Sequence, residues 1–244
     1  MDITIVKKRQ RNILMVLALI ATMSYLSMQI TEFNILDALS AFPTALLWMA
    51  TNFYPNQESM SNLGSILANL QESVLLAIAT TTTSAILALA FALTDTRHNV
   101  KLEWFMKLIA SIFRNIPDIV WAIVLLLTFG QNIVAGFFAL FFATFGFLIR
   151  AFSEAIAESG RSSIEALEAS GAGYCQVVFQ AIIPSCITQI ITWVLYMIET
   201  NIRSSTLVGI LTGTGVGNLF NLYYKSFDYH SASLVVIMLI VVIL

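Results

Sequence analysis

Long apolar segments with few or no charged residues alternate with short polar segments along this chain. Crossing the hydrocarbon core of a bilayer takes about 20 residues of helix at ~1.5 Å of rise per residue. We therefore expect about six transmembrane helices, at residues 12–31, 73–94, 108–129, 133–149, 184–208 and 229–244. The last segment is short for a span, and we expect the sequence to stop inside that helix. The turn signal Gly130-Gln131-Asn132 separates the third helix from the fourth.

The composition supports this interpretation and excludes a water-soluble domain. Hydrophobic residues make up 58% of the 244 residues, charged residues make up 11%, and the mean hydropathy is +0.85. This apolar fraction exceeds what a soluble core needs. The predicted fold class is an all-α polytopic membrane protein with one domain, residues 1–244. A net charge of −2 gives no indication of a nucleic-acid partner.

The distribution of charge predicts how the helices are oriented. The basic cluster Lys7, Lys8, Arg9 and Arg11 precedes the first helix and, under the positive-inside rule, places the N-terminus in the cytoplasm. A cleaved signal peptide is the competing interpretation, but no A-x-A cleavage site follows the apolar run. Residues 32–72 contain neither Lys nor Arg, so we predict an extracytoplasmic loop there. Apolar residues of this loop recur at helical spacing, which fits either an interfacial helix or loop cover packed on other helices: Ile35, Leu36, Leu39, Phe42, Leu46 and Leu47.

Two polar features fall inside the predicted spans. Residues 80–84 are small and polar, which allows close helix approach, so we expect this face to pack on protein rather than on lipid. Arg114 and Asp118 flank Pro117 in the third helix. Lipid cannot solvate such charges, so we expect this pair to face a neighbouring helix or a wet cavity.

The sequence offers no residues for catalysis or metal binding. Cys175 and Cys186 are too few and too poorly spaced for a disulfide framework or a metal site, and His98 and His230 are far apart in the sequence. Neither HExxH nor CxxC occurs. GxxxxGK[ST] is also missing, so we expect no catalytic residue, no metal, no cofactor and no nucleotide-binding loop in this chain.

Residues 150–183 form a long polar insert, which charge sorting places in the cytoplasm. Ser162 and Glu165 have capping-box spacing and predict a short helix with Ile164 and Leu167 on one side. Glycines at 171 and 173 end that helix, and a second short helix leads from residue 174 to the proline at 184, where the fifth span starts. A pair of amphipathic helices joined by a glycine elbow suits docking in a groove of another protein, although an ordinary loop is the alternative.

The spacing within this insert resembles the EAA motif of ABC importer permeases. Glu165 and Ala166 are followed by Gly171 six residues after the Glu, and by Pro184 thirteen residues after that Gly. Leu167 stands where the motif has its second Ala, and Ala181 replaces the usual Ile.

The resemblance implies a type I ABC importer transmembrane domain of the MetI-like kind, with the insert as its coupling helix. That helix would sit in a cleft of a separate cytoplasmic ATPase dimer, which would bind ATP and Mg. The implied coupling residues are Glu165, Ala166, Gly171, Tyr174 and Pro184. Gly171 would supply a turn that residues with side chains disfavour.

A second polar constellation follows on the fifth helix. Glu199 and Arg203 are spaced i,i+4, so they share a helix face and can pair. Glu199 lies fifteen residues beyond Pro184, about 22 Å along the axis, which places the pair in the outer half of the membrane. The pair is either a structural ion pair or part of a translocation path.

This region is similar to the corresponding part of phosphonate ABC permeases. The similarity covers Glu199-x-Asn201-x-Arg203-Ser204-x-Thr206 and the run Gly213-x-Gly215-x-Gly217, and it extends to residues 114–122 and 152–156. Arginine, hydroxyl groups and glycine-rich backbone can all bind phosphoryl oxygens. The predicted substrate-path residues are Glu199, Arg203, Ser204, Thr206, Gly213 and Gly215.

The sequence therefore predicts the permease subunit of an ATP-driven importer for phosphonate or a related phosphorus oxyanion in the bacterial cytoplasmic membrane. Its expected partners are the ATPase dimer, an extracytoplasmic substrate-binding protein, a second copy of itself and membrane lipid. The same mechanism could serve phosphate, phosphite or methionine. Two alternatives from other classes are a secondary transporter with Glu199 or Asp118 as its proton site, and a membrane scaffold without transport.

Overall fold

The computed structural model describes residues 3–95, 100–159 and 161–244, and these divide into two units, 1–53 and 54–244. The first unit contains α1 (Ile3–Ile30) and α2 (Ile35–Asn52). Asn34 begins α2, because its side chain accepts a hydrogen bond from the Leu36 N–H at 3.0 Å and so satisfies one of the free donors of the first turn. The helix expected from the apolar spacing in the predicted outer loop is thus confirmed. Its place at an outer membrane surface stays a prediction.

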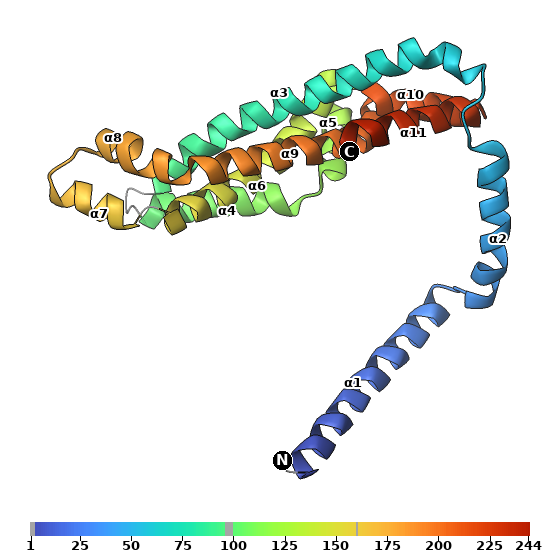
Figure 1. Ribbon diagram of the computed structural model, residues 1–244, viewed down its shortest axis with the longest axis horizontal. Helices are drawn as coiled ribbons and strands as arrows, with labels where there is room; N and C mark the ends of the chain where they lie inside the picture. Colours follow the sequence, from blue (N-terminus) through green and yellow to red (C-terminus); the bar gives the residue numbers. More distant parts are fainter. Residues whose placement is uncertain (1–2, 96–99, 160) are drawn as a thin grey trace. The chain divides into compact units, whose positions relative to one another are not determined.

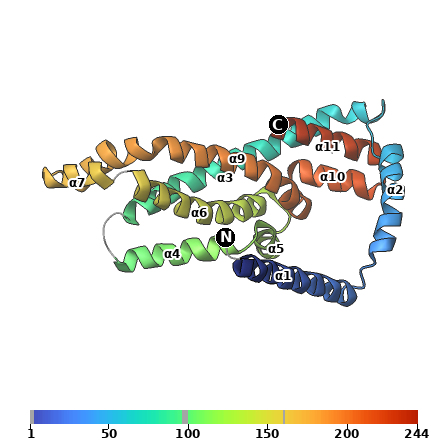
Figure 2. The same cartoon turned by 60° about the horizontal axis from the view of Figure 1, so that its bottom comes forward.

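Three long helices form the centre of the second unit, preceded by the short turn η1 (Ser59–Asn62). They are α3 (Leu63–Asp95), α6 (Ile133–Ser159) and α9 (Ile183–Thr212), which lie side by side in both views (Figure 1, Figure 2). The prediction that one face of the small polar run at 80–84 packs on protein is confirmed, because Thr80, Thr81 and Ser84 are fully buried, while residues 82 and 83 are exposed.

The third predicted span is corrected by the structure. Instead of one helix over residues 108–129, there are two, α4 (Val100–Asn115) and α5 (Asp118–Phe129), which meet at 88°. Pro117 explains the break, because proline has no N–H to continue a helix and disfavours helical geometry in the residue before it.

The other helices cover the ends of this core. The polar insert holds α7 (Arg161–Ala169), α8 (Tyr174–Val177) and the π-helical turn η2 (Val178–Ile182), while α10 (Gly215–Lys225) and α11 (Tyr229–Ile243) follow α9. Several helices are longer than their apolar segments: α3 starts before residue 73, and α6 continues past 149. Hydropathy marks where a chain is apolar, whereas a helix ends where a glycine, a proline or a cap ends it.

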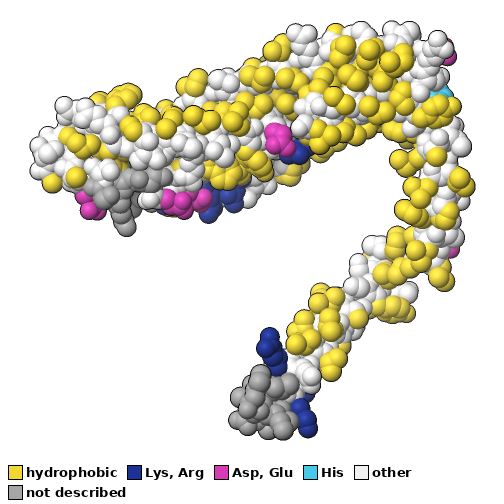
Figure 3. Space-filling view, in the orientation of Figure 1, with side chains coloured by type: hydrophobic (Ala, Val, Ile, Leu, Met, Phe, Trp, Pro, Cys, Tyr) yellow, Lys and Arg dark blue, Asp and Glu magenta, His cyan; other side chains and the backbone are white. Residues whose placement is uncertain are grey.

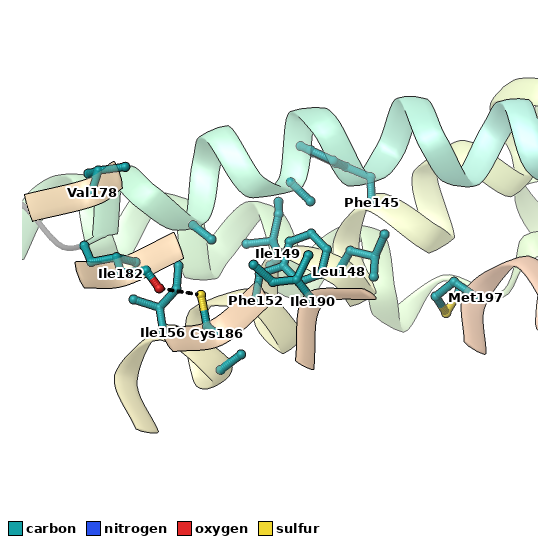
Figure 4. Close-up of a cluster of buried hydrophobic side chains, with 14 of the residues drawn as sticks. Phe145, Leu148, Ile149, Phe152, Ile156, Val178, Ile182, Cys186, Ile190 and Met197 are labelled. Atoms are coloured by element: carbon teal, nitrogen blue, oxygen red, sulfur yellow. Dashed lines mark hydrogen bonds between the residues drawn. The ribbon is translucent and has the colours of Figure 1, made fainter. Parts of the chain in front are cut away.

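Four helical stretches are long and apolar enough to cross a membrane: 7–30, 59–94, 133–158 and 174–212. The bent pair of α4 and α5 would make a fifth if it forms one broken span, and α11 is shorter. The hydrophobic core reaches from these spans into the polar insert. In Figure 4, Phe152 and Ile156 of α6 point toward Ile182 and Cys186, at the junction of η2 and α9.

Candidate functional site

The predicted coupling segment is built as two short helices around a glycine elbow. On α7, Ile164 and Leu167 are partly buried against the core, while Glu165 and Ala166 are exposed on the opposite side. The helix starts at Arg161, one residue before the predicted cap; the side chain of Ser162 lies outside the described residues.

Gly171 forms the elbow, as the spacing predicted. Its φ is +80°, a left-handed conformation that glycine adopts without the steric cost of a Cβ. Its N–H donates to the Glu168 carbonyl at 3.0 Å, and the Ala172 N–H donates to the Leu167 carbonyl at 3.1 Å. These bonds satisfy carbonyls at the end of α7. Nothing lies within 4 Å of where a Cβ on Gly171 would be.

Tyr174 fastens the elbow to the helix core. Its hydroxyl donates to the Leu93 carbonyl, near the end of α3, at 2.6 Å. One residue earlier, the Gly173 N–H donates to Gln176 Oε1 at 2.8 Å, which caps α8. Tyr174 therefore ties the segment that follows the elbow to α3.

Pro184 lies in the first turn of α9, which begins at Ile183, one residue before the predicted start. Helical structure is continuous from residue 174 to 212, with the π turn η2 just before the proline. Proline cannot donate a hydrogen bond, and its ring collides with the carbonyl four residues earlier. A π turn widens the helix there and relieves that collision. The part of the coupling segment after the elbow, α8 and η2, is thus continuous with α9, and we call residues 174–212 the rod.

Glu199 and Arg203 pair on α9, as their spacing predicted. Arg203 Nη1 lies 3.2 Å from Glu199 Oε1, and the two side chains are 51% and 49% exposed. An acidic and a basic side chain adjoin over α9 in Figure 3. Exposed ion pairs contribute about 0–1 kcal/mol to stability, so this pair adds little to the stability of the fold. Ser204 and Thr206 are partly buried, and Thr206 Oγ1 has no hydrogen-bond partner among the described residues.

The opposite face of α9 carries a polar network that sequence reasoning missed. Asn201 is 3% exposed, and its amide donates to Thr81 Oγ1 of α3 at 2.8 Å and to Thr144 Oγ1 of α6 at 2.9 Å. Thr144 in turn donates to Asn201 Oδ1 at 3.1 Å. Three helices are joined at one point. The periodic buried positions at 201, 205, 208 and 212 were the signal in the sequence.

The glycine-rich run closes α9 onto α10. Gly213 ends α9 with φ +71°, and its N–H donates to the Gly209 carbonyl at 2.9 Å. The Val216 N–H donates to Ser73 Oγ at 2.9 Å. The Gly213 and Val216 N–H groups are thus bonded inside the protein. Binding of phosphoryl oxygens by this glycine-rich backbone stays a prediction.

Gly215 and Gly217 lie where a larger side chain would collide with its neighbours. A Cβ on Gly217 would meet the Thr206 carbonyl oxygen, and one on Gly215 would meet Ser73 Oγ. Gly213 and Gly215 both have a positive φ, which favours glycine. Their place in a substrate path stays a prediction.

Membrane-length helices held together by buried polar contacts, with an exposed elbow continuous with one of them, define a polytopic α-helical membrane protein. Within residues 3–95, 100–159 and 161–244 no group of three or more His, Cys, Asp or Glu could hold a metal ion. The chain belongs to the family of binding-protein-dependent transport system inner membrane components, whose family model matches residues 84–244. The resemblance expected from the coupling segment is thereby confirmed.

Relatives of this chain are named for phosphorus oxyanions. It is 28% identical over 142 residues to a phosphate-import permease protein of Mycolicibacterium smegmatis, covering 58% of this chain and 27% of that protein. It is 31% identical over 119 residues to a putative phosphite transport system permease protein of Stutzerimonas stutzeri, covering 49% and 46%. A putative cryptic phosphonate transport system permease protein of Escherichia coli is 28% identical over 105 residues, covering 43% and 86%. The chain thus spans about a quarter and just under half of the first two relatives.

Solved structures share the fold. The MetNI methionine ABC transporter in inward-facing conformations has a chain with a TM-score of 0.62 at 23% identity, covering 73% of this chain and 91% of that one. A chain of an amino acid ABC transporter crystallised with histidines has a TM-score of 0.66 at 16% identity, covering 77% and 92%. The predicted fold class, a MetI-like transmembrane domain, is confirmed.

Proposed function

We propose that this chain is the permease subunit of an ATP-driven ABC importer that moves phosphonate or a related phosphorus oxyanion by alternating access. The observation that carries the proposal is the half-exposed pair Glu199–Arg203 on a helix long and apolar enough to cross a membrane. Charged groups at membrane depth are costly unless they face a cavity or another protein. The pair therefore belongs on a surface that water or a second subunit covers.

The coupling segment supports the ATP-driven part of this proposal. The exposed side of α7, with Glu165 and Ala166, is free to dock on a cytoplasmic ATPase, which would bind ATP and Mg. Closure of two ATPase subunits would push on the elbow, and the rod from residue 174 to 212 would carry the motion to Arg203. One chain supplies one such segment, so the transporter contains two copies of it around a shared path.

The chemistry of α9 supports a phosphorus oxyanion as the cargo. Arg203 offers a planar group with several donors that suits phosphoryl oxygens, and Ser204 and Thr206 add hydroxyl groups close by. Glu199 holds the arginine in place until the anion competes for it. An extracytoplasmic substrate-binding protein would deliver the anion and provide most of the selectivity. Names of the relatives, which refer to phosphate, phosphite and phosphonate, point to the same class.

Uptake by proteoliposomes that contain the permease, its ATPase and its binding protein tests the proposal. Arg203→Ala should lower ATP-dependent phosphonate uptake by about 10-fold or more, since a lost charge-assisted hydrogen bond is worth about 1.5–3 kcal/mol. Arg203→Lys should keep part of the uptake, and Glu199→Gln should reduce it less than Arg203→Ala.

Lys225→Gln, which removes an exposed cation from α10, is the matched control and should transport as the wild type. Normal uptake in all three variants of the pair would make it a structural ion pair. Uptake that persists without the ATPase would instead indicate a secondary transporter.

A further inference from the structure

A second cationic site lies away from α9, in a cavity of about 580 Å³ between α4 and α6. Figure 3 shows basic and acidic side chains gathered over this region, on a surface that is otherwise mostly hydrophobic. The charged side chains that line the cavity are Lys107 and Arg114 of α4 and Arg150 and Glu154 of α6. None of them belongs to α7, to the elbow at Gly171 or to the pair on α9.

Close packing of the two helices brings these cations together. A Cβ on Gly146 of α6 would lie 2.7 Å from the Arg114 backbone nitrogen and 2.8 Å from Phe113 Cβ, so α4 and α6 touch at this glycine. Arg150 follows Gly146 by one helical turn and therefore lies on the same face of α6. The glycine thus sets the distance across which Arg114 and Arg150 line one cavity.

Positive charge in the cavity exceeds negative charge. Among the residues that the structure describes, three cations line it against one carboxylate, Glu154, which accepts a hydrogen bond from Arg150 Nε at 2.7 Å. Both members of this pair are more than half exposed, so the pair is weak and can exchange for a ligand. Arg114 has no hydrogen bond or ion pair within the described residues.

The cavity also has an apolar floor. Met106, Ala110 and Ile149 line it and are less than 10% exposed, and Ser111 and Ser153 place hydroxyl groups beside the cations. Guanidinium groups bind oxyanions through paired N–H donors, and the serines can add O–H donors. An apolar floor beneath charged walls suits a ligand with an anionic head and an organic substituent.

We infer that the cavity between α4 and α6 binds a phosphorus oxyanion that carries an organic group. Two sources share this chemistry: a soluble organophosphonate, and the headgroup of an anionic phospholipid. The inference does not depend on the proposed cargo, because it is argued only from the residues that line the cavity. Binding is also measurable without the ATPase, so its failure and a failure of transport are separate results.

Calorimetric titration of the purified full-length chain, in a nonionic detergent free of phosphate, tests the inference with butylphosphonate as the soluble probe. Native mass spectrometry with phosphatidylglycerol tests the lipid arm. Arg114→Gln and Arg150→Gln should each weaken binding about 10-fold, because each removes a charge-assisted hydrogen bond. Arg114→Lys should retain more affinity than Arg114→Gln.

Glu154→Gln should tighten binding several-fold, since it frees Arg150 and removes the carboxylate that repels the ligand. A purely structural cluster would give no such gain. Lys225→Gln is the control for a general loss of positive charge and should bind as the wild type; thermal unfolding checks that every variant is folded.

Saturable binding of butylphosphonate would identify a solute site, and retention of phosphatidylglycerol alone would identify a headgroup site. Either result supports the inference if the Gln variants at 114 and 150 lose it. The inference is overturned if neither probe binds, if those variants bind as the wild type, or if Glu154→Gln binds more weakly.

Discussion

The rod from residue 174 to 212 is flanked by two G-x-G turns that look alike in sequence and differ in structure. Both begin with a left-handed glycine, Gly171 with φ +80° and Gly213 with φ +71°. Around Gly171 there is open space, whereas the second glycine of the later turn, Gly215, is pressed against Ser73 of α3. Glycine is needed for its backbone freedom in both turns, and in the second turn also for its small size.

Because of this difference, the two ends of the rod differ in how readily they can change shape. The exposed elbow at Gly171 can change shape without displacing a neighbour, which suits a segment that docks on a partner. The turn at Gly213 is fixed by α3 and by α10, so motion delivered to the rod meets an anchor there. Three predictions test the contrast, and they run from the largest expected effect to the smallest.

Gly217→Ala should give the largest effect, because its Cβ would meet the Thr206 backbone carbonyl, which cannot move aside without distorting α9. Overpacking of this kind costs about 3 kcal/mol. The apparent Tm in detergent should fall by about 10 °C. Gly64→Ala is the matched control, since nothing lies within 4 Å of its Cβ and alanine favours helix, so its Tm should stay level or rise. An unchanged Tm for Gly217→Ala would show that the anchor is loose.

Gly215→Ala should cost about 2 kcal/mol through two causes, the left-handed backbone and the collision with Ser73 Oγ. Ser73→Ala alone should also destabilise, because the buried Val216 N–H loses its acceptor. In the double variant the collision is relieved, so its loss of stability should be smaller than the sum of the losses of the two single variants. Strict additivity in thermal or denaturant unfolding would contradict this account of the packing.

Gly171→Ala should cost about 1 kcal/mol of stability, because alanine must adopt the left-handed backbone conformation. Gly171→Asn should cost less, because asparagine adopts that conformation more readily. Gly171→Leu should insert into the membrane and fold like the alanine variant, because the site is open. If the elbow transmits motion, uptake should nevertheless fall at least ~5-fold while ATP hydrolysis continues. Loss of membrane insertion would make the segment a folding element, and normal uptake per ATP would remove it from the coupling path.

Much of this molecule could be predicted because the determining signals are local. Apolar segments of sufficient length predicted the long helices, and the i,i+4 spacing of Glu199 and Arg203 predicted their pairing. The glycine at 171 predicted a turn because few other residues adopt that conformation. Each of these features depends on residues within a few positions of one another.

What could not be predicted depends on contacts between distant segments or on competing local rules. The periodic position of Asn201 on its helix predicts burial, but its partners are known only when α3 and α6 bring Thr81 and Thr144 to it. Proline at 117 breaks a helix, whereas Pro184 is absorbed by a π turn. Pro184 lies in the first turn of α9, where proline is tolerated, whereas Pro117 lies between the end of α4 and the start of α5.

The π turn at residues 178–182 determines how the side chains before it are oriented relative to the side chains after it. A π turn contains one more residue than an α turn, and successive helical residues are about 100° apart around the axis. Relative to Glu199 and Arg203, the face that carries Tyr174 is therefore turned by roughly that angle from where an uninterrupted α-helix would place it. Deleting one residue from this turn would keep both ends intact and aim the coupling end at a different neighbour. The length of this single turn thus determines the orientation of Tyr174 relative to Glu199 and Arg203.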